Sequence, residues 1–314
     1  MINEKLIGFH DGFVDRLKLI PFERYASACL LFFCLLVLGT SAAAQKTAAP
    51  GADSHYASLD KVRIHYQNYG KGSEALVFIH GWTCNIDNWT DQLPDFAKRG
   101  RVIAIDLPGH GRSDKPEVTY SMDLFARGVD AVLRDAGVQR AVLVGHSMGT
   151  PVARQFYRKY PQKTLAIVIV DGPLRAFGDK KMMDGFIAPL RGPNYKDAGA
   201  GMLASMAGPG LTPELKERIK ASFLNTPQYV LVSAMESMAD ESIWGEDKIN
   251  VPVLAIMAKS PFYPPQIDQY YHSLAPQLDF QMWEGVGHFI MMEKPKQFND
   301  ALLAFLDKNA LLKK

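Results

Sequence analysis

From residue 60 onward, short continuous apolar runs alternate with segments whose apolar positions repeat at helical spacing. A short hairpin comes first, and the runs that predict buried strands then cover residues 76–79, 102–105, 141–144, 165–170 and 253–257. A sixth run, 278–283, alternates apolar and polar positions, which is typical of an edge strand. Helical spacing covers residues 124–133, 152–160 and 298–306. This order predicts an α/β fold with a mostly parallel sheet and helices on both of its faces.

The alternation is interrupted over residues 172–247, where Pro, Gly and Met are frequent and Pro213 opens a helical segment. We therefore expect a core formed by residues 60–171 and 248–314, with a helical cap inserted between them. The insertion contains Met182, Met183, Met202, Met206, Met235 and Met238. Flexible thioether side chains suit an adaptable apolar pocket wall, and they equally suit ordinary packing of the insertion on the core.

Near the start, residues 28–39 are almost all apolar and are followed by Ser41-Ala42-Ala43-Ala44-Gln45. This pattern predicts a signal peptide over residues 1–44, cleaved after Ala44, and hence a secreted or periplasmic protein without stable membrane insertion. An N-terminal membrane anchor is the alternative, but the apolar stretch is shorter than the about 20 residues that a spanning helix needs. Residues 45–59 are interpreted as a flexible lead-in.

Composition narrows the classes of function. The 35 Lys and Arg residues are interspersed with 33 Asp and Glu residues for a net charge of +2, so no nucleic-acid footprint is expected. Cys29 and Cys34 lie in the predicted signal peptide, which leaves Cys84 and no intramolecular disulfide in the mature chain. Cys84 is interpreted as a small packed hydrophobe rather than a reactive thiol.

The strongest chemical signal is Gly145-His146-Ser147-Met148-Gly149, placed between a predicted strand and a predicted helix. A serine at the tip of a sharp strand-to-helix turn needs small residues two positions before and after it, because larger side chains there would collide. The pattern therefore predicts a nucleophile elbow with Ser147 at its tip.

Together with this elbow, three further segments give residues 60–306 a resemblance to the α/β-hydrolase family. They are His80-Gly81-Trp82, Asp106-Leu107-Pro108-Gly109-His110-Gly111-Arg112-Ser113 and Gly285-Val286-Gly287-His288-Phe289. The resemblance implies an α/β-hydrolase fold in which His288 is the general base and the backbone N–H groups of Trp82 and Met148 form an oxyanion hole. The segment 106–113 would shape a turn beside the active site.

The resemblance also implies a carboxylate after the strand 253–257, but residues 258–265 contain none. Some members of the family take the acid from the end of the preceding strand, and that position is Asp171. Aspartate before Gly-Pro is also ordinary turn chemistry. The open alternatives are Asp268, Asp240, Glu241 and a Ser–His pair without an acid.

These residues predict a serine hydrolase that cleaves a small apolar carboxylic ester or lactone through an acyl-enzyme, without a cofactor or metal. Other serine-triad reactions of the same fold remain open, namely C–C bond or amide hydrolysis and peracid formation. A non-catalytic hydrolase-like ligand-binding protein is the alternative from a different class. Reactions that need an aspartate nucleophile are disfavoured because the elbow residue is Ser147.

Overall fold

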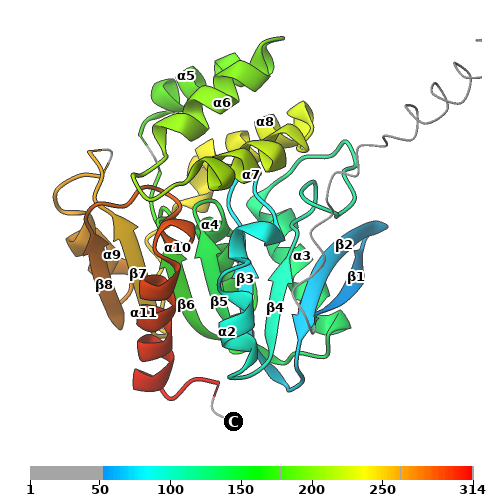
Figure 1. Ribbon diagram of the computed structural model, residues 1–314, viewed down its shortest axis with the longest axis vertical. Coiled ribbons are helices and arrows are strands. Elements are labelled where there is room, and N and C mark those ends of the chain that lie inside the picture. The colour runs from blue at the N-terminus through cyan, green and yellow to red at the C-terminus, as the bar shows by residue number, and fades with distance from the viewer. Residues whose placement is uncertain (1–51, 177, 262, 313–314) are drawn as a thin grey trace, which may run out of the picture. The chain divides into compact units, whose positions relative to one another are not determined.

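The computed structural model describes residues 52–176, 178–261 and 263–312. In this part of the chain eight strands form one sheet in the order β1-β2-β4-β3-β5-β6-β7-β8 (Figure 1). Their bounds are β1 Asp53–Leu59, β2 Val62–Tyr69, β3 Glu74–Ile79, β4 Val102–Ile105, β5 Arg140–His146, β6 Thr164–Val170, β7 Val253–Ala258 and β8 Leu278–Trp283. Strand β2 pairs antiparallel with β1 and β4, and the other pairs are parallel. The predicted α/β fold is confirmed.

The buried strands lie where the apolar runs placed them, and β8 takes the edge position that its alternating pattern predicted. One prediction about the start of the core is wrong. Residues 53–59, expected to belong to a flexible lead-in, form β1 and pair along their whole length with β2. The predicted signal peptide, residues 1–44, lies outside the described residues.

Helices cover both faces of the sheet. Their bounds are α2 Leu93–Ala97, α3 Met122–Asp135, α4 Gly149–Lys159, α9 Ile267–Leu274, α10 Ile290–Glu293 and α11 Pro295–Lys308. Helices α2 and α11 lie together in front of the sheet in Figure 1, where the amide of Asn299 donates to Asp95 (3.0 Å). Helices α3 and α4 lie behind it and are joined by an ion pair between Asp123 and Lys159 (2.5 Å). None of the helices in the described segments has the length and apolar character that a bilayer crossing requires.

The cap consists of α5 Lys180–Arg191, α6 Tyr195–Ser205, α7 Pro213–Leu224 and α8 Gln228–Ala239, followed by the short 3₁₀ helix η3 Glu241–Ile243. These helices lie above the carboxyl edge of the parallel strands (Figure 1). They fall within the insertion expected over residues 172–247. Helix α7 begins at Pro213, and Thr212 caps it by accepting the N–H of Leu215, as the helix-opening signal predicted.

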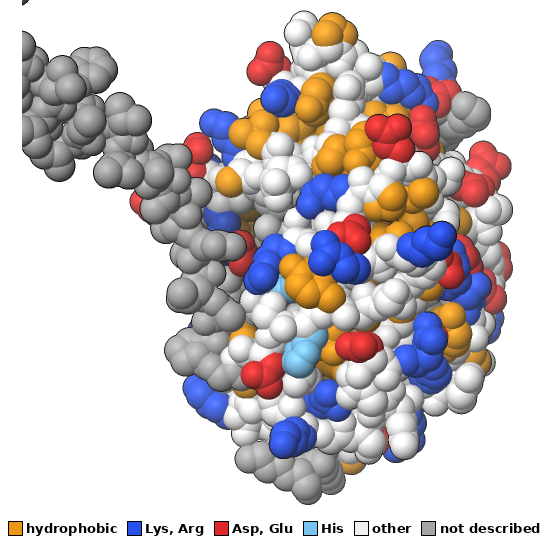
Figure 2. Space-filling view, turned by 90° about the vertical axis from the view of Figure 1, so that its right-hand side faces the viewer, with side chains coloured by type: hydrophobic (Ala, Val, Ile, Leu, Met, Phe, Trp, Pro, Cys, Tyr) orange, Lys and Arg blue, Asp and Glu red, His pale blue; other side chains and the backbone are white. Residues whose placement is uncertain are grey.

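Charged side chains are mixed on the surface. On the face seen in Figure 2, Lys and Arg side chains alternate with Asp and Glu side chains among scattered apolar groups. That face presents no extended patch of one sign, in line with the interspersed charges of the sequence.

A buried arginine on α4 holds both ends of the cap. The side chain of Arg154 is 1% exposed and donates to the carbonyl oxygen of Leu174 (2.7 Å), where the cap begins. The same guanidinium donates to the carbonyl oxygens of Gly245 and Asp247, where the cap ends. Because α4 starts at Gly149, two residues after Ser147, the cap is tied to the helix that follows the predicted nucleophile.

We expect Arg154→Ala to lower the free energy of unfolding by about 2–4 kcal/mol, because it leaves the buried carbonyl oxygen of Leu174 and the partly buried ones at the other end of the cap without this donor. Urea unfolding followed by circular dichroism measures this. The control is Arg191→Ala, which removes an exposed cap arginine paired with Glu236 (2.7 Å). The control should change the free energy by no more than about 0.5 kcal/mol. Equal losses in the two variants would contradict the role of the buried side chain.

Candidate active site

Ser147 occupies a strained turn between β5 and α4. Its φ is 51°, in the left-handed region that favours glycine, and such a conformation costs about 1–3 kcal/mol. A Cβ atom added to Gly145 would lie 2.4 Å from the carbonyl oxygen of Gly149, and one added to Gly149 would lie 2.4 Å from that of Ile79. The predicted need for glycine on both sides of the serine is confirmed.

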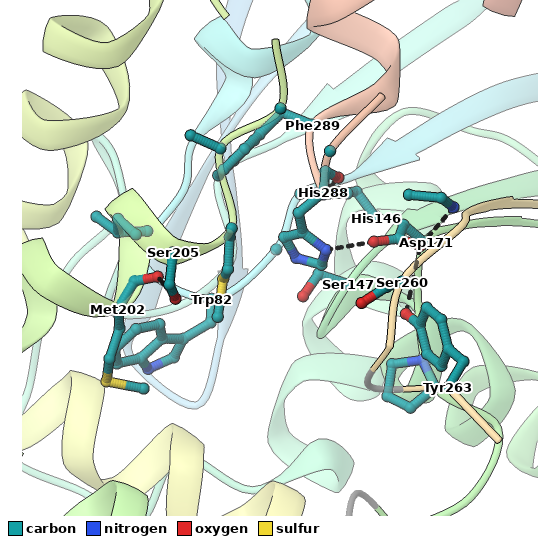
Figure 3. A pocket seen from close by; sticks show the side chains of 18 of the residues that line it. Trp82, His146, Ser147, Asp171, Met202, Ser205, Ser260, Tyr263, His288 and Phe289 are labelled. Atoms are coloured by element: carbon teal, nitrogen blue, oxygen red, sulfur yellow. Dashed lines mark hydrogen bonds and ion pairs between the residues drawn. The ribbon is translucent and has the colours of Figure 1, made fainter. Parts of the chain in front are cut away.

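Asp171 and His288 lie beside Ser147 at the carboxyl edge of the sheet. Asp171 directly follows β6, the parallel neighbour of β5, and is 4% exposed. His288 lies in the loop after β8, and its Nδ1 is 2.6 Å from Asp171 Oδ2. Since a carboxylate only accepts, Nδ1 carries the proton and Nε2 is left for another partner. Figure 3 shows Ser147 next to the His288 ring, whose other edge faces Asp171.

The loop after β7, residues 258–265, contains no carboxylate, and it contributes hydrogen-bond donors to Asp171. The N–H of Ala258, at the end of β7, donates to Asp171 Oδ1 (2.8 Å), and the hydroxyl of Tyr263 donates to the same oxygen (3.3 Å). Burial and the charge of Asp171 raise the pKa of Tyr263 well above its ordinary value, so the hydroxyl keeps its proton. The sequence analysis missed Tyr263, although the absence of an acid from its loop was a signal.

The other carboxylates weighed as alternatives do not line the cavity that contains Ser147. Asp240 caps the short helix η3 by accepting the N–H of Ser242 (2.9 Å), and Glu241 lies beside it on the surface. Asp268 lies in the first turn of α9. Of the four carboxylates, the structure brings only Asp171 to the His288 ring.

Two backbone N–H groups adjoin Ser147. The loop His80-Gly81-Trp82 passes so close that a Cβ atom on Gly81 would lie 3.1 Å from the Ser147 Cβ. Within the described residues, the N–H groups of Trp82 and Met148 donate to no backbone acceptor. The indole of Trp82 points to the cap, where it donates to the carbonyl oxygen of Leu231 (2.8 Å). The predicted oxyanion donors are thus not used in backbone hydrogen bonds of the described residues.

A cavity of about 510 Å³ opens above these residues. The cap lines it mainly with apolar side chains: Met183, Phe186, Met202, Met206, Met235, Met238 and Trp244. Figure 3 shows Met202 and Trp82 across the cavity from His288 and Asp171. Five of the six methionines of the insertion thus form a pocket wall, whereas Met182 is 41% exposed and does not.

A second Ser–His–Asp chain lies outside this cavity. Ser54 Oγ is 2.9 Å from His65 Nε2, and His65 Nδ1 is 2.7 Å from Asp106 Oδ2. Asp106 also accepts the N–H groups of Ile86 (2.9 Å) and Arg112 (3.0 Å), so it joins β2 to two loops. Ser54 lies on the edge strand β1, away from the elbow and the cavity. Its contacts serve structure, and nothing in the sequence around His65 had indicated them.

No cluster of three or more His, Cys, Asp or Glu side chains that could hold a metal ion occurs in the segments that the structure describes.

A serine on a strand-to-helix elbow, with a His–Asp pair at the same edge of a mostly parallel sheet, is the arrangement of an α/β-hydrolase fold. The sequence model of the alpha/beta hydrolase fold family matches residues 74–295, and this chain belongs to that family.

Individual relatives differ in activity. The non-heme chloroperoxidase of Streptomyces lividans is 30% identical over 268 residues, which cover 79% of this chain and 97% of that protein. The dihydrolipoyllysine-residue acetyltransferase component of the acetoin cleaving system of Cupriavidus necator is 37% identical over 124 residues, 40% of this chain and 33% of that protein. The match covers 33% to 65% of the length of three curated relatives, namely two acetyltransferase components of acetoin cleaving systems and epoxide hydrolase 1 of Caenorhabditis elegans.

Among solved structures, Est816, described as an N-acyl homoserine lactone degrading enzyme, superposes with a TM-score of 0.71 at 30% identity. The superposition covers 80% of this chain and 100% of Est816.

Cys84 lines the cavity but is buried, and burial raises the pKa of its thiol to about 12. We therefore expect iodoacetamide at pH 8 to alkylate Cys84 at least about 100-fold more slowly in the native protein than in urea, because the thiolate is scarce and shielded. Mass spectrometry of the peptide that contains Cys84 separates it from the other cysteines. Comparable rates in the two states would make Cys84 a reactive thiol.

Proposed function

We propose that this protein is a serine hydrolase that cleaves carboxylic esters or lactones through an acyl-enzyme. The observation that carries the proposal is the 2.6 Å contact between His288 and Asp171 beside Ser147, on an elbow that only glycine neighbours permit. The proposal rests on this geometry, on membership of the alpha/beta hydrolase fold family, and on the similarity to Est816, which is described as an N-acyl homoserine lactone degrading enzyme.

In the proposed acylation step, Ser147 Oγ attacks the carbonyl carbon and its proton passes to His288 Nε2. The electron pair of the C=O bond moves to the oxygen, which accepts the N–H groups of Trp82 and Met148. Losing one such donor typically costs about 3 kcal/mol of barrier. The C–O bond to the alcohol then breaks, and the leaving oxygen takes the proton from His288. Water repeats the sequence on the acyl-enzyme and frees the acid.

Asp171 holds His288 in the tautomer that this step needs and stabilises the imidazolium that forms. Its two oxygens have separate partners, since Oδ2 faces His288 and Oδ1 accepts from Ala258 and Tyr263. These donors hold the carboxylate in one orientation. They explain how an acid on β6 can replace the acid that the loop after β7 lacks.

The cavity favours a neutral substrate with an apolar acyl group. Apart from Asp171 and the histidines, Lys259 is the charged residue among the described residues that line it, and its ammonium pairs with Glu284 at 2.7 Å. A substrate carboxylate would lose its hydration against methionine and tryptophan side chains without gaining a counter-ion there. The likeness to Est816 makes lactones with an acyl chain a natural part of a substrate panel.

The first test is Ser147→Ala on a panel of esters and lactones. We expect turnover of the best substrate to fall by at least about 10⁴-fold, because the covalent route is lost while the oxyanion donors remain. Labelling by a fluorophosphonate should disappear as well. Ser54→Ala is a matched control, since Ser54 also contacts a His–Asp pair but lies outside the cavity. Full labelling of Ser147→Ala, or loss of labelling in the control, would refute the assignment.

The second test concerns the acid. Asp171→Asn should lower turnover by about 10³- to 10⁴-fold with little change in circular dichroism, because the amide cannot stabilise the imidazolium. Asp268→Asn, on the outer helix α9, should lower it by less than about tenfold, the size of a distant surface effect. Steady-state kinetics on one ester compares the two variants. A larger loss at Asp268 than at Asp171 would show that another carboxylate serves His288.

A further inference from the structure

A buried carboxylate that the proposed reaction does not use lies next to the base. Glu293 ends α10, is 7% exposed, and accepts hydrogen bonds from backbone N–H groups. One donor is Gly287, directly before His288, at 3.1 Å from each carboxylate oxygen. The others are Gly208 (3.3 Å) and Gly210 (3.2 Å), in the cap segment between α6 and α7. One carboxylate thus bridges the base loop and the cap.

The two backbones that Glu293 bridges are in direct contact. A Cβ atom on Gly208 would lie 2.1 Å from the Gly287 nitrogen, and one on Gly287 would lie 2.2 Å from the Gly208 nitrogen. Neither position tolerates a side chain without a shift of the other loop. The glycines therefore allow an approach that Glu293 holds in place.

The backbone of His288 is held from two sides. Its N–H donates to the carbonyl oxygen of Met206 in the cap (2.9 Å). Its carbonyl oxygen accepts from Nε2 of His146 in the core (2.9 Å), and burial keeps the pKa of His146 low, so that ring is neutral. One of the two attachments of the base therefore belongs to the cap.

The same cap segment forms part of the cavity wall. Met206, Ala207, Gly208 and Pro209 all line the space above Ser147. A displacement of this wall by a bound acyl group would be passed through Met206 and Gly208 to the loop that carries His288. Two links therefore join the wall to the loop of the base: the bridge made by Glu293 and the hydrogen bond from His288 to Met206.

We propose that Glu293 is a positioning residue that couples the cap wall at residues 206–210 to His288, so that the fit of the acyl group sets the position of the base. The proposal rests on the esterase or lactonase function proposed above. When the acyl group of the substrate fits the wall, His288 stays in its catalytic position. The fit of the acyl group therefore affects kcat and not only KM. Misplacing a catalytic group by about 1 Å can cost roughly 100-fold in rate.

The test is Glu293→Gln, which keeps the shape but replaces one acceptor oxygen with an NH₂ group that faces N–H donors. Hydrogen exchange followed by mass spectrometry should become faster in residues 206–210 and 285–288 and stay unchanged elsewhere. Turnover is measured with p-nitrophenyl esters from acetate to octanoate. For the acyl chain length that the wild-type protein cleaves fastest, kcat should fall by about 10- to 100-fold. On acetate, whose two-carbon acyl group is too small to fill the cavity of about 510 Å³, we expect kcat to fall by less than about threefold.

Glu236→Gln is the matched control, since it makes the same change on the cap surface, where Glu236 pairs with Arg191 (2.7 Å). It should leave exchange in both segments and the chain-length profile unchanged. Gly208→Ala provides a second route to the same effect, because its methyl group would push the wall away from Gly287. It should reproduce the loss on long chains even if Glu293→Gln does not fold.

Unchanged exchange at 206–210 and 285–288, or a fall in kcat by the same factor for every chain length, would overturn the proposal. The exchange measurement needs no turnover. If the wild-type protein cleaves no ester or lactone, the proposed function fails, while faster exchange confined to the two segments still supports the link that Glu293 makes.

Discussion

The left-handed backbone of Ser147 is the constraint on which the rest of the site depends. It is possible only because Gly145 and Gly149 pack against backbone atoms that a side chain would strike. The turn ends β5 and starts α4 abruptly, so the serine leaves the sheet at its carboxyl edge. Every other component, from Asp171 on the next strand to the loop at Trp82, is near Ser147 because parallel strands end at that edge.

The sequence predicted those parts of the fold that depend on burial and on short-range geometry. Continuous apolar runs marked strands buried on both faces, and the glycine spacing marked the elbow. Strand β1 was missed because its first four residues, 53–56, are all exposed, so that buried and exposed positions do not alternate there and only its pairing with β2 makes it a strand. The displaced acid could be placed at Asp171 because adjacent parallel strands end side by side.

Other parts of the site could not be predicted because they depend on how distant segments meet. Tyr263 contacts Asp171 across 92 positions in the chain, and Glu293 meets Gly208 across 85. A tyrosine in a loop and a glutamate at the end of a short helix have no sequence pattern that indicates such contacts. The hydrogen-bonded series Ser54–His65–Asp106 has the residue types of a catalytic triad but lies outside the cavity. Hydrogen bonds among these residue types do not make a catalytic site without the elbow, the free N–H groups and the cavity.

The attachment of the cap through Arg154 has a consequence for how such proteins diversify. At both junctions of the insertion backbone carbonyl oxygens accept from the guanidinium of Arg154, and the carboxylate of Asp247, the last residue of the insertion, pairs with it as well. A set of unrelated helices inserted between positions 174 and 245 could be held by Arg154 in the same way. The only requirement is that the backbone carbonyl oxygens at both ends again lie within hydrogen-bond distance of its guanidinium. The cap, and with it the shape of the pocket, could then change while the carboxyl edge of the sheet that carries Ser147 stays the same.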